Sequence, residues 1–182
     1  FDKESEMLGV VDKDHFDPLR ETRIVTPEEY SLDYENIGYN QLLVIRGVFS
    51  GGRVITEGGE VTHQGSGPHL PVPDGQYEVL GIAKDGWYRL DPVDGNPRND
   101  IYDNPAYLNS EGQTRRGVRL HSGQTSFGCV TVCENLDPSA RKGYEVLEGI
   151  LESTSTSTVS DNIGAAAIKL FYDRNNIGAV WH

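Results

Sequence analysis

The chain is poor in cysteine and in positive charge. Its 182 residues include two cysteines and one methionine, and 16 Lys and Arg stand against 28 Asp and Glu, which gives a formal net charge of −12. Two cysteines are too few for a disulfide scaffold or for a four-thiolate zinc site. The pair, Cys129 and Cys133, is four residues apart, which is about 13 Å on an extended strand and too far for a disulfide.

Other classes of protein are excluded by what the chain lacks. A nucleic-acid partner is not expected, because binding to phosphates needs a basic face. No apolar run approaches the roughly 18 to 20 residues that a membrane-spanning helix needs, so no membrane insertion is predicted. No basic segment followed by an apolar stretch stands near the start, so the sequence predicts no signal peptide in this chain.

What is present is typical of a globular domain. Hydrophobic residues make up 36% of the chain and charged residues 24%, with 21 glycines and 9 prolines, and the length fits one domain with a sizeable core. Short apolar runs bounded by turn residues predict strands. They are Leu42 to Ile45, Val48–Phe49, Gln76 to Ile82, Trp87 to Leu90, Val118 to His121, Cys129 to Val132, Ile168 to Tyr172 and Gly178 to Trp181.

One helix is predicted after Asp137. Asp137 is the expected N-cap and Pro138 the first helical residue; Tyr144, Leu147, Ile150 and Leu151 follow at helical spacing. The helix is expected to end near Ser153, before an alternating Ser/Thr run that is either a linker or an exposed strand. The fold class is therefore mainly β, a sandwich or barrel with one or two peripheral helices.

The domain organisation is expected to change near residue 40. Residues 1–39 are polar and acidic with short apolar islands such as Met7 to Val11, which predicts a lead-in segment or a hairpin. Residues 40–182 carry the predicted strands and the helix, and form the main domain.

The segment 115–132 holds the residues best suited to chemistry. His121 closes one predicted strand, a seven-residue Ser- and Gly-rich turn follows, and Cys129 opens the next strand. A neighbouring imidazole can take the proton of a thiol, whose ordinary pKa is about 8.5. Gly128 would let a substrate carbonyl approach and leave backbone N–H groups for an oxyanion. The alternative is a buried structural cysteine with a histidine bonded to backbone.

The motif Ser126-Phe127-Gly128-Cys129, with His121 upstream, resembles the active-site motif of the L,D-transpeptidase (YkuD-like) family. That motif is a histidine, a loop, then Ser/Thr-His-Gly-Cys, an apolar residue and Asn. His121, Ser126, Gly128, Cys129 and Val130 match it. Phe127 stands at the position of the second histidine and Thr131 at that of the asparagine. The short loop looks like the compact branch of the family that includes bacterial antagonistic effectors.

A second stretch carries the same resemblance. Residues 66–77, from Ser66-Gly67-Pro68 to Asp74-Gly75-Gln76-Tyr77, look like the Gly-Pro-x-Pro-x-Gly-x-Tyr segment that precedes the active site in the family. The resemblance spans residues 41–181 and would make 40–182 the catalytic domain. The opening Phe1 to Glu4 weakly resembles junctions where polymorphic toxins join a cargo domain to a carrier.

The resemblance implies a cysteine-dependent acyl-transfer enzyme that acts on peptidoglycan stem peptides. It would work as an L,D-carboxypeptidase, an L,D-transpeptidase or a D-amino-acid exchanger, without metal or organic cofactor. Cys129 and His121 would be catalytic, with Gly128 and Ser126 supporting an oxyanion. We expect Arg116, Arg119 and Ser122 to bind substrate, since the arginines at 115, 116 and 119 form the one dense basic cluster in the sequence.

The biological role implied is a secreted antibacterial effector toxin acting in the periplasm of a target cell, with a cognate immunity protein in the producer. Two alternatives stay open. One is a cysteine peptidase of another fold, disfavoured because the cysteine precedes the histidine in the papain-like and NlpC/P60-like types and only His182 follows Cys129. The other is a non-catalytic binding module on the same scaffold.

Other titratable residues are expected to be structural. Cys133 is predicted to pack in the core. His63 and His69 are expected in exposed loops, with a substrate groove as the alternative. The acidic run from Asp91 to Asp103 lacks the spacing of an EF-hand and predicts turns rather than a calcium site.

Overall fold

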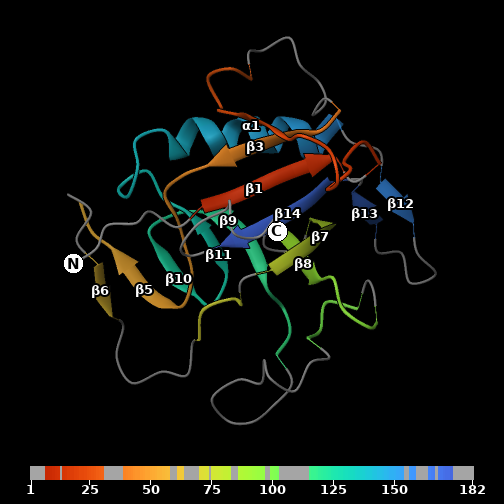
Figure 1. The fold of residues 1–182 in the computed structure, drawn as a ribbon. Helices are drawn as coiled ribbons and strands as arrows, with labels where there is room; N and C mark the ends of the chain where they lie inside the picture. The colour runs from red at the N-terminus through yellow and green to blue at the C-terminus, as the bar shows by residue number, and fades with distance from the viewer. Residues whose placement is uncertain are drawn as a thin grey trace.

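The structure is a computed structural model, and it describes twelve stretches of the chain. They are residues 7–12, 14–30, 39–57, 61–63, 70–73, 75–82, 86–96, 99–102, 115–153, 156–158, 164–166 and 168–173. Within them the fold is mostly β, with three sheets and a single helix (Figure 1). The predicted fold class is thereby confirmed. The predicted strand at 178–181 lies outside the described residues.

The main sheet has nine strands in the order β2-β3-β1-β14-β7-β8-β9-β11-β4. Their bounds are β1 Met7–Asp12, β2 Arg23–Val25, β3 Gln41–Ile45, β4 Val48–Phe49, β7 Gly75–Ile82, β8 Tyr88–Pro92, β9 Arg119–Ser122, β11 Val130–Val132 and β14 Ile168–Asp173. A second sheet has the order β10-β5-β6, formed by Thr125–Phe127, Gly52–Ile55 and Val61–His63. A third pairs β12 Thr156–Thr158 with β13 Gly164–Ala166.

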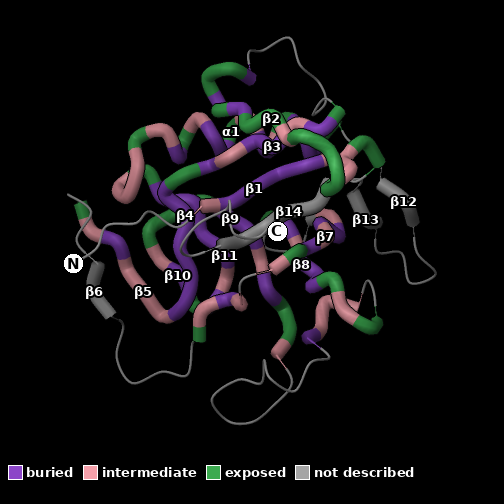
Figure 2. Tube along the Cα trace, in the orientation of Figure 1, coloured by how far each residue is buried: buried purple, intermediate pink, exposed green. Residues whose placement is uncertain are grey.

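The main sheet curls until its two ends approach each other. β3 is second and β4 last in the strand order, yet only Arg46 and Gly47 separate them in the chain. So short a connection spans about 10 Å at most, which brings the far end of the sheet back to its beginning. The concave side encloses the main core, and Figure 2 shows buried residues along β1 and β3 and around β9 and β11.

The N-terminal residues are part of this sheet. β1 lies between β3 and β14 and pairs antiparallel with both, and β2 pairs parallel with β3. Leu8 and Val10 are fully buried in the main core. The apolar island at 7–11 is thus an interior strand that pairs with β3 and β14, and not half of a local hairpin.

The helix α1, Ala140–Ser153, closes the core over the sheet. The Asp137 carboxylate accepts hydrogen bonds from the backbone N–H and the hydroxyl of Ser139, at 2.9 and 2.7 Å, as an N-terminal cap does. Tyr144, Leu147, Ile150 and Leu151 are its buried residues, together with Ala140 and Gly143. The cap, the buried face and the end at Ser153 agree with the prediction. The helix begins at Ala140 and not at Pro138, because the N–H of Ala140 bonds to the carbonyl of Asp137 three residues earlier, in a turn that precedes the first α-helical bond, from Gly143 to Ser139.

Two glycines of α1 give a stability test with opposite signs. A Cβ built on Gly143 would lie 2.7 Å from Cγ2 of Ile45, whereas a Cβ on Gly149 meets nothing within 4 Å. We expect Gly143→Ala to destabilise the fold by about 1 to 3 kcal/mol through overpacking. Gly149→Ala should stabilise it by about 0.5 to 1 kcal/mol, because alanine loses less backbone entropy in a helix. Urea unfolding of both variants measures the difference; equal effects would show that α1 does not pack closely on β3.

Candidate functional site

His121 and Cys129 come from neighbouring parallel strands. β9 and β11 pair in parallel, with Leu120 opposite Val130 and His121 opposite Thr131. Cys129 lies in a bend directly before β11, and extending the register by one residue sets it opposite Arg119. With one strand spacing across and two residues along, the Cα atoms of His121 and Cys129 are about 8 Å apart, a separation that two side chains can bridge.

The two residues also lie on one face of the sheet. Leu120, Val130 and Val132 belong to the main core with α1. Side chains alternate between the faces of a strand, so His121 and Thr131 lie on the opposite face, away from the helix. The same alternation, extended by one residue from β11, puts Cys129 on that face. β8 follows the same rule, since Tyr88 and Leu90 are in the core and Arg89 is on the face of His121.

The register across β8, β9 and β11 arranges these residues in two rows. Tyr88 is opposite Leu120 and Arg89 opposite Arg119. We call the first row, Trp87, His121 and Thr131, the histidine row, and the second, Arg89, Arg119 and Cys129, the cysteine row. The row of the nucleophile candidate thus contains two arginines, Arg119 one strand away and Arg89 two strands away, and the base candidate lies between an aromatic ring and a hydroxyl.

The imidazole of His121 is held on three sides. Its Nδ1 is 3.0 Å from the carbonyl oxygen of Ser122, its Nε2 is 3.1 Å from Oγ1 of Thr131, and its ring stacks on Trp87 at 4.1 Å between centroids and 17° between planes. A carbonyl only accepts, so Nδ1 carries the proton in this contact. Nε2 is then the atom that offers a lone pair, and the Thr131 hydroxyl donates to it.

The cysteines differ as the sequence predicts. Neither forms a disulfide; Cys129 is partly exposed and Cys133 is buried. Cys133 packs with Phe49, Ile55 and Leu136, and burial raises the pKa of its thiol. A buried thiol with a raised pKa is a poor nucleophile, which leaves Cys129 as the candidate.

Ser126 and Gly128 shape the turn before Cys129. Ser126 is fully buried; its hydroxyl donates to the carbonyl of Cys129 at 2.8 Å and accepts from the N–H of Gly128 at 3.3 Å. The Gly128 N–H is therefore directed at Ser126, which argues against the expectation that it donates to an oxyanion. The predicted turn also contains a strand, β10, which pairs with β5 in the second sheet.

Arg115 clamps this turn to the segment at 70–73. Its guanidinium donates to the carbonyls of Leu70 and Gly128, each at 2.7 Å, and to that of Pro71. Gly128 has φ +103, and a Cβ there would lie 2.9 Å from Nη2 of Arg115 and 3.2 Å from the Leu70 oxygen. A glycine is required here because Arg115 and the Leu70 carbonyl occupy the space of a side chain. The sequence-based expectation is different, namely that Gly128 leaves space for a substrate carbonyl.

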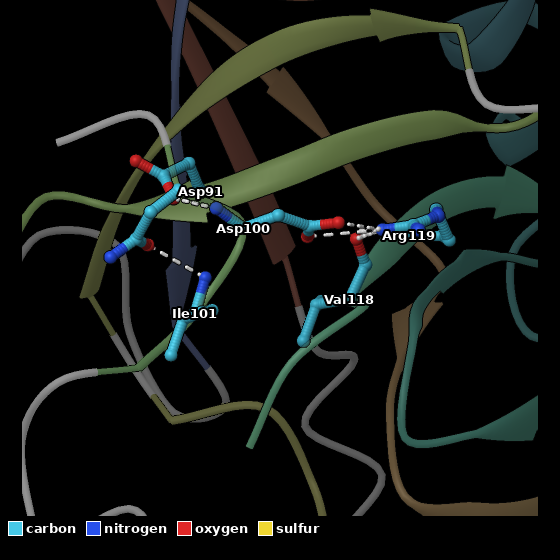
Figure 3. A network of polar contacts seen from close by, with 6 residues as sticks. Asp91, Asp100, Ile101, Val118 and Arg119 are labelled. Atoms are coloured by element: carbon cyan, nitrogen blue, oxygen red, sulfur yellow. Dashed lines mark hydrogen bonds and ion pairs between the residues drawn. The ribbon is translucent and has the colours of Figure 1, made fainter. Parts of the chain in front are cut away.

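Arg119 is engaged by a carboxylate. Its Nη1 is 3.1 and 2.9 Å from the two oxygens of Asp100 and also donates to the carbonyl of Val118 (Figure 3). Burial raises the pKa of the Asp100 carboxyl, and the charges of Arg119 and Arg89 oppose that rise. The buried Asp91 accepts the backbone N–H of Asp100 at 2.7 Å, which fixes a residue held at φ +59.

The other predicted substrate-binding residues lie elsewhere. Arg116 is exposed and forms an isolated bridge with Ile101, outside both rows. Ser122 lines a cavity of about 420 Å³ beside α1, with Tyr144 and Glu148 among its other walls. Its side chain therefore lies on the helix side of the sheet. Its backbone carbonyl accepts the hydrogen bond from Nδ1 of His121.

The sequence missed three residues of this site. The sequence patterns indicate Thr131 only as a departure from the motif, and Trp87 and Arg89 only as members of the predicted strand from Trp87 to Leu90. The available signal is strand alternation, since 87 and 89, 119 and 121, and 129 and 131 are each two apart. Alternation alone does not show that the three pairs share one face. That conclusion also requires knowing that β8 lies beside β9 and that β9 lies beside β11.

No metal site emerges from the residues that the structure describes, where no three His, Cys, Asp or Glu side chains group as ligands. Of the acidic run, Asp91 and Asp100 make the contacts above, and Asp94 accepts the N–H of Asn96 at 3.1 Å, as turn residues do. His63 is the last residue of strand β6 and pairs with Arg53 of β5, so its expected loop position is wrong, because the partner strand β5 is set by tertiary pairing. Its side chain and the whole of His69 lie outside the described part of the chain, so the loop position of His69 stays a prediction.

Comparison with protein-family profiles, with curated proteins and with solved structures found no match to this chain. In the described residues, no helix has the length and apolar character needed to span a membrane.

Proposed function

We propose that the chain is a cysteine acyl-transfer enzyme with Cys129 as nucleophile and His121 as general base. The observation that carries the proposal is the parallel pairing of β9 with β11, which supports a position of Cys129, the residue directly before β11, on the face of His121. The buried, oriented imidazole supports it, because a base must be held in one tautomer to accept a proton at a defined atom.

The proposed reaction has two steps. The Cys129 sulfur attacks a peptide carbonyl carbon, and its proton passes to Nε2 of His121. The carbon–nitrogen bond then breaks, the leaving amine takes that proton, and a thioester joins the acyl group to Cys129. Water or a second amine attacks the thioester, releases the acid or the new amide, and restores the thiol.

The contacts of His121 suit both protonation states. While Nε2 is neutral, the Thr131 hydroxyl donates to it; once Nε2 is protonated, the same oxygen accepts. Nδ1 stays bonded to the Ser122 carbonyl throughout. The N–H of Gly128 bonds to Ser126, so the N–H of Cys129 is the oxyanion donor that we propose.

The substrate class rests on the resemblance of the motif at 121–130 to L,D-transpeptidases. It supports peptidoglycan stem peptides as substrates, with L,D-carboxypeptidase or transpeptidase and D-amino-acid exchange activity. The compact motif supports a role as a secreted antibacterial effector acting in the periplasm of a target cell, neutralised in the producer by an immunity protein.

Purified muropeptides test the chemistry. The chain is incubated with a disaccharide tetrapeptide, with and without a D-amino acid, and products are identified by mass spectrometry. Loss of the terminal residue indicates the carboxypeptidase, and its replacement indicates exchange. A chain that is folded but leaves the tetrapeptide intact, while cleaving an unrelated peptide, would favour a cysteine peptidase of another kind; no turnover at all would favour a binding module.

Expression in a sensitive bacterium tests the biological role. The chain is directed either to the periplasm or to the cytoplasm, with the Cys129→Ala variant as the matched control for each. Growth arrest in the periplasm alone, absent in the variant, is the expected result. Toxicity confined to the cytoplasm would contradict the cell-wall role.

Thr131 gives a test of how His121 is positioned. Thr131→Val keeps the branched shape and removes the hydroxyl bonded to Nε2, so we expect kcat to fall about tenfold, in line with a hydrogen bond of about 1.5 kcal/mol, with KM little changed. Thr131→Ser should restore most of the rate. Equal rates for the wild-type chain and Thr131→Val would show that the hydroxyl does not position the imidazole.

A further inference from the structure

The arginine best placed to recognise an anion beside Cys129 is Arg89 rather than the predicted Arg116 or Arg119. Arg116 lies outside the cysteine row. Arg119 lies in it, but its guanidinium is bonded to both oxygens of Asp100. Arg115 lies next to Gly128, but its guanidinium is bonded to three backbone carbonyls. Arg89 lies opposite Arg119 on the neighbouring strand.

Arg89 carries a donor that the described part of the chain does not satisfy. Its Nε is buried and has no hydrogen-bond partner there. Its charge acts on Asp100, whose two oxygens face Arg119. A buried guanidinium N–H without an acceptor is costly, and an oxygen anion is the acceptor that a guanidinium fits best.

Among the described residues, the carboxylates near Arg89 are bonded to other groups. Arg89, Arg119, Asp91 and Asp100 are the charged residues that the described strands β8 and β9 and the segment 99–102 bring together here. The aspartates are committed, because Asp91 accepts the N–H of Asp100 and Asp100 holds Arg119. Like charges directly opposite on paired strands repel, so a further anion between Arg89 and Arg119 would relieve their repulsion.

The position relative to Cys129 indicates which anion. Arg89 and Cys129 are two strands apart in one row, about 10 Å between Cα atoms, and an extended arginine reaches over much of that distance. In a peptide attacked at its last bond, the terminal carboxylate lies within about 5 Å of the scissile carbonyl, by ordinary backbone dimensions. A carboxylate one residue beyond the attacked bond therefore falls between the sulfur and the guanidinium.

We propose that Arg89 binds the terminal carboxylate of the leaving residue, so that the site accepts peptides with a single residue beyond the scissile bond. This inference rests on the proposed function, because it takes Cys129 as the nucleophile. It makes the enzyme selective for a free chain end, as a carboxypeptidase or an exchange enzyme is, and places Arg89 in substrate binding.

The test pairs two substrates with two variants. The substrates are a stem tetrapeptide with a free terminal carboxylate and the same peptide amidated at that end. For the wild-type chain, amidation should lower kcat/KM by about 10- to 100-fold. Arg89→Gln should lower it by a similar factor for the free acid and little for the amide. Arg141→Gln is the control, since Arg141 is exposed on α1 and pairs with Glu145; it should behave as wild type.

Equal losses on both substrates in Arg89→Gln would overturn the proposal and show a structural role. Failure of the proposed function is distinguished by a binding arm that needs no turnover. Calorimetry of the Cys129→Ala chain should give tighter binding of the free acid than of the amide, and the Arg89→Gln change should remove the difference. Equal binding of the two peptides, or binding of neither, overturns the Arg89 proposal even if the wild-type chain turns over no muropeptide.

Discussion

Cys129→Ala is expected to lower the rate of release of the terminal residue from a muropeptide tetrapeptide by about 10³-fold or more. The proposed thioester cannot form without the sulfur, and loss of a nucleophile or its base removes most of the rate enhancement in acyl-transfer sites. His121→Gln should cost a similar factor, because no other base lies in the two rows. Glutamine also fills much of the space of the ring, which is only 4% exposed, whereas alanine would leave a cavity beneath Trp87.

The matched control is Cys133→Ala. Cys133 is 1% exposed and packs with Phe49 and Ile55, so its truncation should cost about 1 to 2 kcal/mol of stability and leave turnover unchanged. Progress curves on one purified tetrapeptide compare the three variants, with circular dichroism to verify folding. Full activity in Cys129→Ala, or activity lost in Cys133→Ala alone, would show that the nucleophile is assigned wrongly.

Gly128→Ala is expected to destabilise the chain by about 2 to 4 kcal/mol and to abolish turnover. Two costs add: a side chain at φ +103 is strained, and its Cβ would press on Arg115 and on the Leu70 carbonyl. Arg115 cannot swing aside freely, because it bonds three carbonyls. Urea unfolding measures the stability and the tetrapeptide assay the activity.

Gly86 provides the control that separates these costs. It has φ +83, and a Cβ there meets nothing within 4 Å. Gly86→Ala should therefore cost only the conformational part, about 1 to 2 kcal/mol. Adding Arg115→Ala to Gly128→Ala should give less than the sum of the single effects, since the two residues share one contact. Equal costs at the two glycines would mean that the clamp does not hold the turn.

The parts of the fold that could be predicted are those that short sequence patterns specify. The strand Gln76 to Ile82 and the helix after Asp137 are set by local apolar periodicity and by a cap, and both appear where expected. The sequence predicts a turn where the short strand β10 lies, because Thr125–Phe127 pairs with β5, a segment about 70 residues earlier in the chain. The place of β1 beside β14 depends on pairing across most of the chain.

The candidate site also has residues that the sequence could predict and contacts that it could not. The motif indicates Cys129 and His121 as candidates, because residue type and spacing in one short segment are enough to suggest them. The packing roles of Ser126 and Gly128 depend on Cys129, Arg115 and Leu70 in the folded chain. Arg115 and Arg119 appeared equivalent as members of one basic cluster. Their partners at 70–71 and at 100 are remote in sequence, so neither the clamp nor the ion pair could be read from the cluster.

By itself, the sequence determined a β-rich domain with one capped helix, without a disulfide scaffold, and with a thiol and an imidazole eight residues apart in one motif. Residue type, charge and periodicity are local properties, and they suffice for those conclusions. The tertiary structure alone decided that Trp87 and Thr131 hold His121, that Arg119 is committed to Asp100, and that Arg89 carries the unsatisfied donor. Those facts depend on which strands are neighbours and in what register, and many sequences with the same local patterns could pair their strands differently.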